Sequence, residues 1–73
     1  MMKTIAIHTE FIRLDALLKL AGLAETGGHA KAMIQQGEVL VNEDPCTQRG
    51  RKIRPGDRVQ AGDETLEVAE KTA

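Results

Sequence analysis

The chain has 73 residues, of which 41% are hydrophobic and 29% charged, with a formal net charge of −1. This length allows one small domain that buries only about 60% of the surface exposed by its unfolded form, and the composition argues against a disordered tail. The single cysteine, Cys46, excludes an internal disulfide. With no apolar run of membrane-spanning length and no signal-peptide pattern, we expect a cytoplasmic protein that does not enter a membrane.

The first part of the chain predicts a strand and a helix. Ile5 and Ile7 alternate within residues 4–8, which is typical of a short strand with one buried face. In residues 13–22 apolar side chains recur at helical spacing, Asp15 falls in the first turn, and Gly22 is placed to end the helix. The apolar residues of this helix are Leu14, Leu17, Leu18 and Ala21.

A second helix is predicted to begin after Thr26, whose hydroxyl suits an N-cap, and to end at Gly37. Gly27 and Gly28 would occupy its first turn, where each glycine costs up to about 1 kcal/mol relative to alanine. The pattern leaves two interpretations equally open: the glycines belong to the helix, or they end a flexible loop before it. The residues expected to point inward are Ala30, Met33 and Ile34.

From Glu38 onward the apolar residues alternate, which predicts several short strands. Turns are expected at residues 42–45 and 62–63, and residues 54–57 fit a type II turn with Gly56 at positive φ. Residues 70–73 are expected to fray. The predicted fold is therefore α+β, with a helix pair packed on a small, mostly antiparallel twisted sheet. The strand residues expected to face inward are Val39, Val41, Val59, Ala61, Leu66 and Val68.

Residues 49–58 hold half of the cations of the chain and only one anion, so this segment carries +4 and the remainder −5. A concentrated positive patch on an acidic body indicates docking to an anion, with phosphate as the first candidate. A run of charges is more often only a solvated face, and the segment alone leaves that interpretation open.

The order of the cations restricts how they could share a ligand. In an extended strand Arg49 and Arg51 would point to one side, whereas Lys52 and Arg54 would point to the other. They can reach one ligand together only if the first part of the segment is a loop, which Gly50 favours.

The start of the second helix is another candidate phosphate site. A helix N-terminus presents unpaired amides and about half a positive charge, and glycines there let an anion approach the backbone. Lys31 follows Gly27 by one turn and could lean back over this end, and His29 could assist if protonated.

Other chemistry finds little support in the sequence. The lone aromatic residue, Phe11, offers no series of platforms for stacking single-stranded bases, which favours recognition of nucleic acid by backbone and shape. His8, His29 and Cys46 lack the spacing of metal ligands, and Cys46 has the character of a small apolar filler. We therefore expect no metal, no cofactor and no catalysis.

The runs RLDALLKLAGLAETGGHAKAMIQQGEVLVN (residues 13–42) and RKIRPGDRV (residues 51–59) resemble the S4 RNA-binding domain. The whole chain looks most like the small free-standing bacterial members, the YbcJ/YaaA type, with one domain over residues 1–73 and its core at about 3–69. The resemblance implies the S4-like (αL) fold and an RNA surface lined by Arg13, Thr26, Lys31 and the cations after Asn42. The chain departs from the family pattern at Gly27, usually arginine there, and at Glu43, commonly glycine.

We accordingly predict a monomeric, non-catalytic protein that binds structured or duplex RNA, such as ribosomal RNA, through phosphate contacts. The alternative is a protein-interaction adaptor that uses the basic loop and the helix pair. Duplex DNA stays open as a ligand, because recognition of a 2′-hydroxyl leaves no mark in the sequence. The candidate binding residues are Arg13, Thr26, Gly27, Gly28, His29, Lys31, Arg49, Arg51, Lys52 and Arg54.

Overall fold

The computed structural model describes residues 2–71, which form two helices and seven strands. In chain order these elements are β1 (Met2–Ile7), β2 (Ile12–Arg13), α1 (Leu14–Leu20), α2 (Gly27–Gln35), β3 (Val39–Val41), β4 (Asp44–Pro45), β5 (Lys52–Ile53), β6 (Arg58–Ala61) and β7 (Glu64–Glu70).

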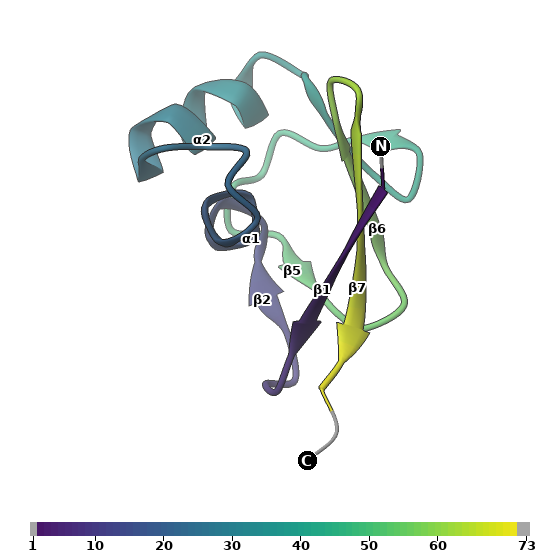
Figure 1. The fold of residues 1–73 in the computed structure, drawn as a ribbon. Coiled ribbons are helices and arrows are strands. Elements are labelled where there is room, and N and C mark those ends of the chain that lie inside the picture. The colour runs from purple at the N-terminus through teal and green to yellow at the C-terminus, as the bar shows by residue number, and fades with distance from the viewer. Residues whose placement is uncertain (1, 72–73) are drawn as a thin grey trace.

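Five strands form one sheet in the order β1-β7-β6-β3-β4, and β2 pairs with β5 in a separate two-stranded ribbon. The pairing of β1 with β7 is parallel, and every other pairing is antiparallel. Both helices lie together on one side of the sheet, and β2 and β5 lie next to α1 (Figure 1). The predicted α+β class with a mostly antiparallel sheet is therefore confirmed.

Both helices end in the same glycine-dependent motif. Gly22 and Gly37 adopt φ of 79° and 78°, a conformation that glycine reaches without steric cost. The Leu23 amide donates to Leu18 O and the Glu38 amide to Met33 O, the long hydrogen bonds of a Schellman motif. The two glycines thus turn the chain sharply after each helix, as the sequence predicted.

The second helix begins at Gly27, so the interpretation that placed the glycines in a loop before the helix is wrong. Thr26 is the N-cap, and its Oγ1 accepts a hydrogen bond from the His29 amide at 3.0 Å. This hydrogen bond satisfies one amide of the first turn, and it offsets part of the free-energy cost of the two glycines there.

The space between helices and sheet is filled by aliphatic side chains and one cysteine. Met33, expected to point inward, is only partly buried, and Ile12 also packs at the edge of this core. None of the buried residues of the described chain is polar or charged. The core consists of Ile7, Leu14, Leu17, Leu18, Ala21, Ala24, Ala30, Ile34, Val39, Val41, Cys46, Ile53, Val59, Ala61, Leu66 and Val68.

The end of the chain is more ordered than predicted. Glu70, expected to fray, is the last residue of β7 and pairs with Ile7, and the Lys71 amide donates to Ile7 O at 2.7 Å. The parallel partner β1 supplies these contacts, which the local sequence does not reveal. Residues 72–73, expected to fray as well, lie outside the described residues.

Two strands that the sequence did not reveal, β2 and β5, have only two residues each. The predicted turn after them is present: Gly56 has φ of 97° and the Asp57 amide donates to Arg54 O at 3.0 Å. Neither helix has the length and apolar character needed to cross a bilayer, a statement that covers residues 2–71.

Candidate nucleic-acid interface

The β2–β5 ribbon has one apolar face and one basic face. Ile12 pairs with Ile53, and Arg13 pairs with Lys52. Residues directly opposite each other in antiparallel strands point to the same side, and neighbours along a strand point to opposite sides. Since Ile53 is completely buried, Arg13 and Lys52 must point away from the core, in agreement with their exposure.

One aromatic ring extends the basic face. The ribbon register, continued by one residue, places Phe11 opposite Arg54. The Lys52 Nζ lies 4.9 Å and the Arg54 guanidinium carbon 6.0 Å from the centroid of the Phe11 ring, both within the range of a cation–π contact. The side chains of Lys52 and Arg54 therefore share one side, as the alternation predicted. We call Phe11, Arg13, Lys52 and Arg54 the basic ribbon.

The segment before the ribbon is a loop, as Gly50 suggested, and it closes onto the start of α1. The carbonyl oxygen of Arg51 accepts from the Leu14 amide at 2.9 Å, and that of Arg49 accepts from the Asp15 amide at 3.1 Å. We call residues 49–51 the basic loop. Its backbone carbonyls cap the start of α1, and the side chains of Arg49 and Arg51 are exposed at that end of the helix.

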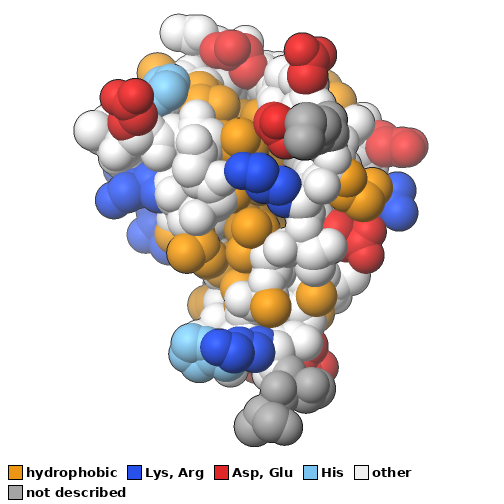
Figure 2. All heavy atoms as spheres, viewed as in Figure 1, with side chains coloured by type: hydrophobic (Ala, Val, Ile, Leu, Met, Phe, Trp, Pro, Cys, Tyr) orange, Lys and Arg blue, Asp and Glu red, His pale blue; other side chains and the backbone are white. Residues whose placement is uncertain are grey.

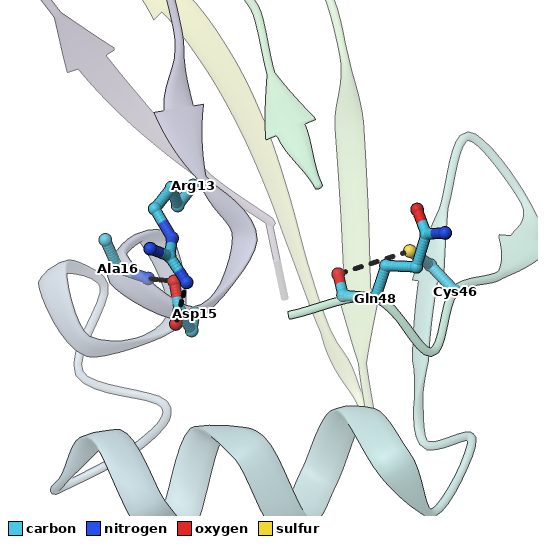
Figure 3. A network of polar contacts seen from close by, with 5 residues as sticks. All are labelled: Arg13, Asp15, Ala16, Cys46 and Gln48. Carbon is cyan, nitrogen blue, oxygen red and sulfur yellow. Dashed lines mark hydrogen bonds and ion pairs between the residues drawn. The ribbon is translucent and has the colours of Figure 1, made fainter. Parts of the chain in front are cut away.

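The Arg13 guanidinium lies between α1 and the basic loop. Its Nη2 is 3.2 Å from Asp15 Oδ2, and the Asp15 carboxylate also accepts from the Ala16 amide at 2.8 Å (Figure 3). A Cβ added to Gly50 would lie 3.7 Å from Arg13 Nη2, so loop and guanidinium are close neighbours. The Asp15 carboxylate neutralises part of the positive charge here.

The two helix starts differ in their free amides. At α1 the amides of Leu14, Asp15 and Ala16 all have acceptors. At α2 the Thr26 hydroxyl takes only the third amide, and those of Gly27 and Gly28 donate to no group within residues 2–71. Only α2 therefore presents the unpaired donors that an anion could use.

His29 completes the turn before α2. Its Nδ1 accepts a hydrogen bond from the Glu25 amide at 3.2 Å, while its own amide donates to the Thr26 hydroxyl. A ring nitrogen that accepts carries no proton, so in this geometry Nδ1 is occupied by the Glu25 amide. The imidazole thus orders the chain ahead of the exposed glycines.

A shallow depression joins the two helix starts. It is lined by Arg13, Asp15, Ala16, Lys19 and Gly27. Lys19 was not among the residues predicted for the site, because its helical position alone gave it the appearance of an ordinary solvated lysine. It lies one turn after Asp15, and the packing of α1 against α2 brings it toward Gly27.

All ten residues predicted for the site are exposed. The ribbon register and the loop hydrogen bonds bring Arg13, the basic loop and Lys52 together, and the depression adds Gly27. Lys31 is connected only through α2, where it follows Gly27 by one turn, and a helical side chain at this position is expected to point toward the helix start. We call the basic ribbon, the basic loop, Lys19, Lys31 and the start of α2 the basic surface.

Apart from Asp15, the acidic side chains are most frequent in other parts of the molecule (Figure 2). In the view of Figure 2 acidic side chains are most frequent along the top and right, and basic side chains lie on the left margin beside the helices, with others at the centre, at the right edge and at the bottom. No group of three or more His, Cys, Asp or Glu side chains within the described chain is arranged to hold a metal ion. Cys46 is buried, with its Sγ 3.7 Å from Gln48 O, as expected of an apolar filler (Figure 3).

A helix pair on a small sheet, with a basic loop returning to the start of the first helix, defines a small α+β domain with exposed cations at that helix start. The family model of the S4 domain matches residues 5–69, so the chain belongs to the S4 domain family. It is also 47% identical over 60 residues to the "Probable ribosome maturation protein RlbA" of Bacillus subtilis (strain 168), across 82% of this chain and 84% of that protein. The resemblance to the S4 family is thereby confirmed.

Proposed function

We propose that this protein binds structured RNA of the ribosome or its precursors, through contacts between RNA phosphates and the basic surface. The observation that carries the proposal is the closure of the basic loop onto α1, which gathers Arg13, the loop cations and Lys52 at one end of the helix pair. Membership of the S4 family and the similarity to a probable ribosome maturation protein support RNA and the ribosome as the partner class.

The surface offers two kinds of phosphate donor. Arginine and lysine side chains of the basic ribbon and the basic loop provide mobile charge, because all of them are exposed. The unpaired amides of Gly27 and Gly28 provide fixed donors at the positive end of α2. Glycine has no Cβ to stand between those amides and a phosphate, and apart from the adjoining residues and helix backbone no atom of the described chain lies within 4 Å of a Cβ added to Gly27.

This set of donors suits recognition of the RNA backbone. Contacts to phosphates fix the position of a protein on a helix and carry no sequence information directly. Such binding releases counterions, so the logarithm of affinity falls by about 0.9 per contacted phosphate for each tenfold rise in salt. The proposed activity is thus binding of a folded RNA shape, with no reaction.

Charge reversal of Arg51 and Lys52 tests the proposal. At about 0.15 M salt, each phosphate contact strengthens binding roughly fivefold relative to 1 M salt. The double variant Arg51→Glu/Lys52→Glu loses two such contacts, so it should bind ribosomal RNA fragments about 30-fold more weakly. Its salt dependence should fall by about two contacts. Filter binding or gel shifts across a salt series would measure both quantities.

The matched control is Lys3→Glu/Lys71→Glu, which changes the net charge equally at positions outside the basic surface. Its fold is checked first by circular dichroism, because Lys3 Nζ donates to Ala21 O at 3.3 Å. Equal loss of affinity in both double variants would contradict a localised binding surface. Duplex DNA of the same sequence and heparin serve as competitors. Displacement of the RNA by heparin at the same charge concentration, with no preference for RNA, would instead favour an adaptor that binds an acidic protein.

A further inference from the structure

The single aromatic residue of the chain lies within the basic surface. Phe11 is only half-buried, and the core contains no aromatic side chain. The ribbon register puts the ring on the exposed face, and both Lys52 and Arg54 approach it within 6.0 Å. The ring thus faces the positively charged side of the ribbon, where a nucleic acid would lie.

We propose that Phe11 is a stacking site for one unpaired base of the bound RNA, with Lys52 and Arg54 binding the phosphates on either side of that nucleotide. This inference rests on the proposed function and adds a feature of the RNA that the protein selects. Aromatic side chains beside cations are the usual means by which proteins hold an unstacked base, since the ring takes the base and the cations take its backbone.

The cation now at the ring can give way to a base. Lys52 Nζ lies 4.9 Å from the ring centroid in the free protein, and its long flexible stem allows the ammonium to move to a phosphate. An exposed cation–π contact contributes about two- to fivefold to an equilibrium, whereas a stacked base contributes about 5- to 150-fold. The exchange is therefore favourable, and Lys52 keeps a partner in both states.

The anions near the ring do not prevent this arrangement. Glu10 precedes Phe11 and is exposed, so its side chain can remain in solvent. Asp15 is paired with Arg13 beyond the end of the ribbon. Because every base has an aromatic face, the site would accept any nucleotide and would select the presence of an unpaired base, such as a bulge, within a folded RNA.

Two RNAs separate this proposal from simple phosphate binding. One is a duplex whose ends are closed by non-nucleotide linkers, and the other is the same duplex with a single bulged 2-aminopurine. We expect the wild-type protein to bind the bulged RNA about tenfold more tightly and to quench its fluorescence. Phe11→Leu should abolish that preference for the bulged RNA, and Phe11→Trp should retain it.

The control variant is Leu20→Ala, which removes an apolar side chain that is 61% exposed at the far end of α1. It should bind both RNAs as the wild type does. Equal weakening of both RNAs by Phe11→Leu, with the variant folded by circular dichroism, would overturn the proposal. Equal wild-type affinity for the two RNAs would overturn the stacking proposal and leave the proposed function intact. No binding to either RNA would overturn both.

Discussion

The carbonyl oxygen of Arg51 accepts a hydrogen bond from the amide of Leu14 at 2.9 Å, so the backbone of the basic loop caps the first helix. Arg13, the residue at the N-cap position of α1, makes no capping hydrogen bond with its side chain. The same three-residue loop therefore has two separable roles. Its main chain stabilises the fold, while its side chains are free to contact a ligand.

This separation predicts opposite effects of two substitutions at one position. Arg51→Ala keeps the capping carbonyl, so the free energy of unfolding should change by no more than about 0.5 kcal/mol while RNA affinity falls. Arg51→Pro removes the amide that donates to Gln48 O at 3.1 Å and restricts the preceding Gly50, so it should cost about 1–3 kcal/mol. Urea denaturation measures both values, and equal stability of the two variants would contradict a structural role of the loop backbone.

Asp15 reduces the positive charge of the surface, and removing its charge should strengthen RNA binding. Its carboxylate lies 3.2 Å from Arg13 Nη2, and the two side chains are 20% and 57% exposed. In Asp15→Asn the Arg13 guanidinium loses this competitor for phosphate, so we expect a two- to fivefold gain in affinity, equivalent to up to about 1 kcal/mol. Stability should fall by about 0.3–1 kcal/mol, because a negative charge is lost from the first turn of α1.

The control for this effect is Glu38→Gln, which neutralises an exposed carboxylate after the far end of α2. Gel-shift titrations at about 0.05 M and 0.2 M salt should show a gain for Asp15→Asn that shrinks at the higher concentration, because screening weakens interactions between exposed charges. The same gain in Glu38→Gln would mean that only net charge matters.

Thr26 links the stability of α2 to the proposed phosphate site. Thr26→Ala removes the acceptor for the His29 amide, which should cost about 1 kcal/mol, whereas Thr26→Ser keeps the hydroxyl and most of the stability. RNA affinity should follow the same order, because fraying of the first turn disperses the amides of Gly27 and Gly28. Amide hydrogen exchange at residues 27–30 would report this fraying, and unchanged exchange in Thr26→Ala would contradict it.

The sequence predicted the elements whose signals are local. The helical spacing of Leu14, Leu17 and Leu18, the capping hydroxyl of Thr26 and the stop at Gly22 each need only a few neighbouring residues to be recognised. The same holds for the turn at residues 54–57, where proline and glycine determine the backbone.

What the sequence could not supply are contacts between distant segments. The pairing of Ile12 with Ile53 spans about half of the chain, and strands of two residues are too short to show alternation. That pairing is what turns Phe11, Lys52 and Arg54 to one side. The sequence could therefore supply candidate residues for the site, whereas Lys19 and the position of Phe11 became apparent only from the tertiary structure.

The hairpin between β3 and β4 contains a strained residue that offers a test of backbone energetics. Asn42 and Glu43 have φ of 50° and 73°, the left-handed values required at both central positions of a type I′ turn. A left-handed conformation costs an ordinary L-residue about 1–2 kcal/mol, and glycine avoids that cost but loses about 0.5–1 kcal/mol more in conformational entropy on folding.

Glu43→Gly should therefore raise the free energy of unfolding by about 0.5–1 kcal/mol, which corresponds to an increase in Tm of about 2–8 °C for a domain of this size. Asn42→Gly is the matched variant and should be destabilising, because it removes the amide side chain that accepts from the Arg58 amide at 3.0 Å and donates to Asp57 Oδ1 at 3.2 Å. Thermal unfolding followed by circular dichroism distinguishes the two. A lower Tm for Glu43→Gly would mean that the glutamate side chain stabilises the hairpin by more than its backbone strain costs.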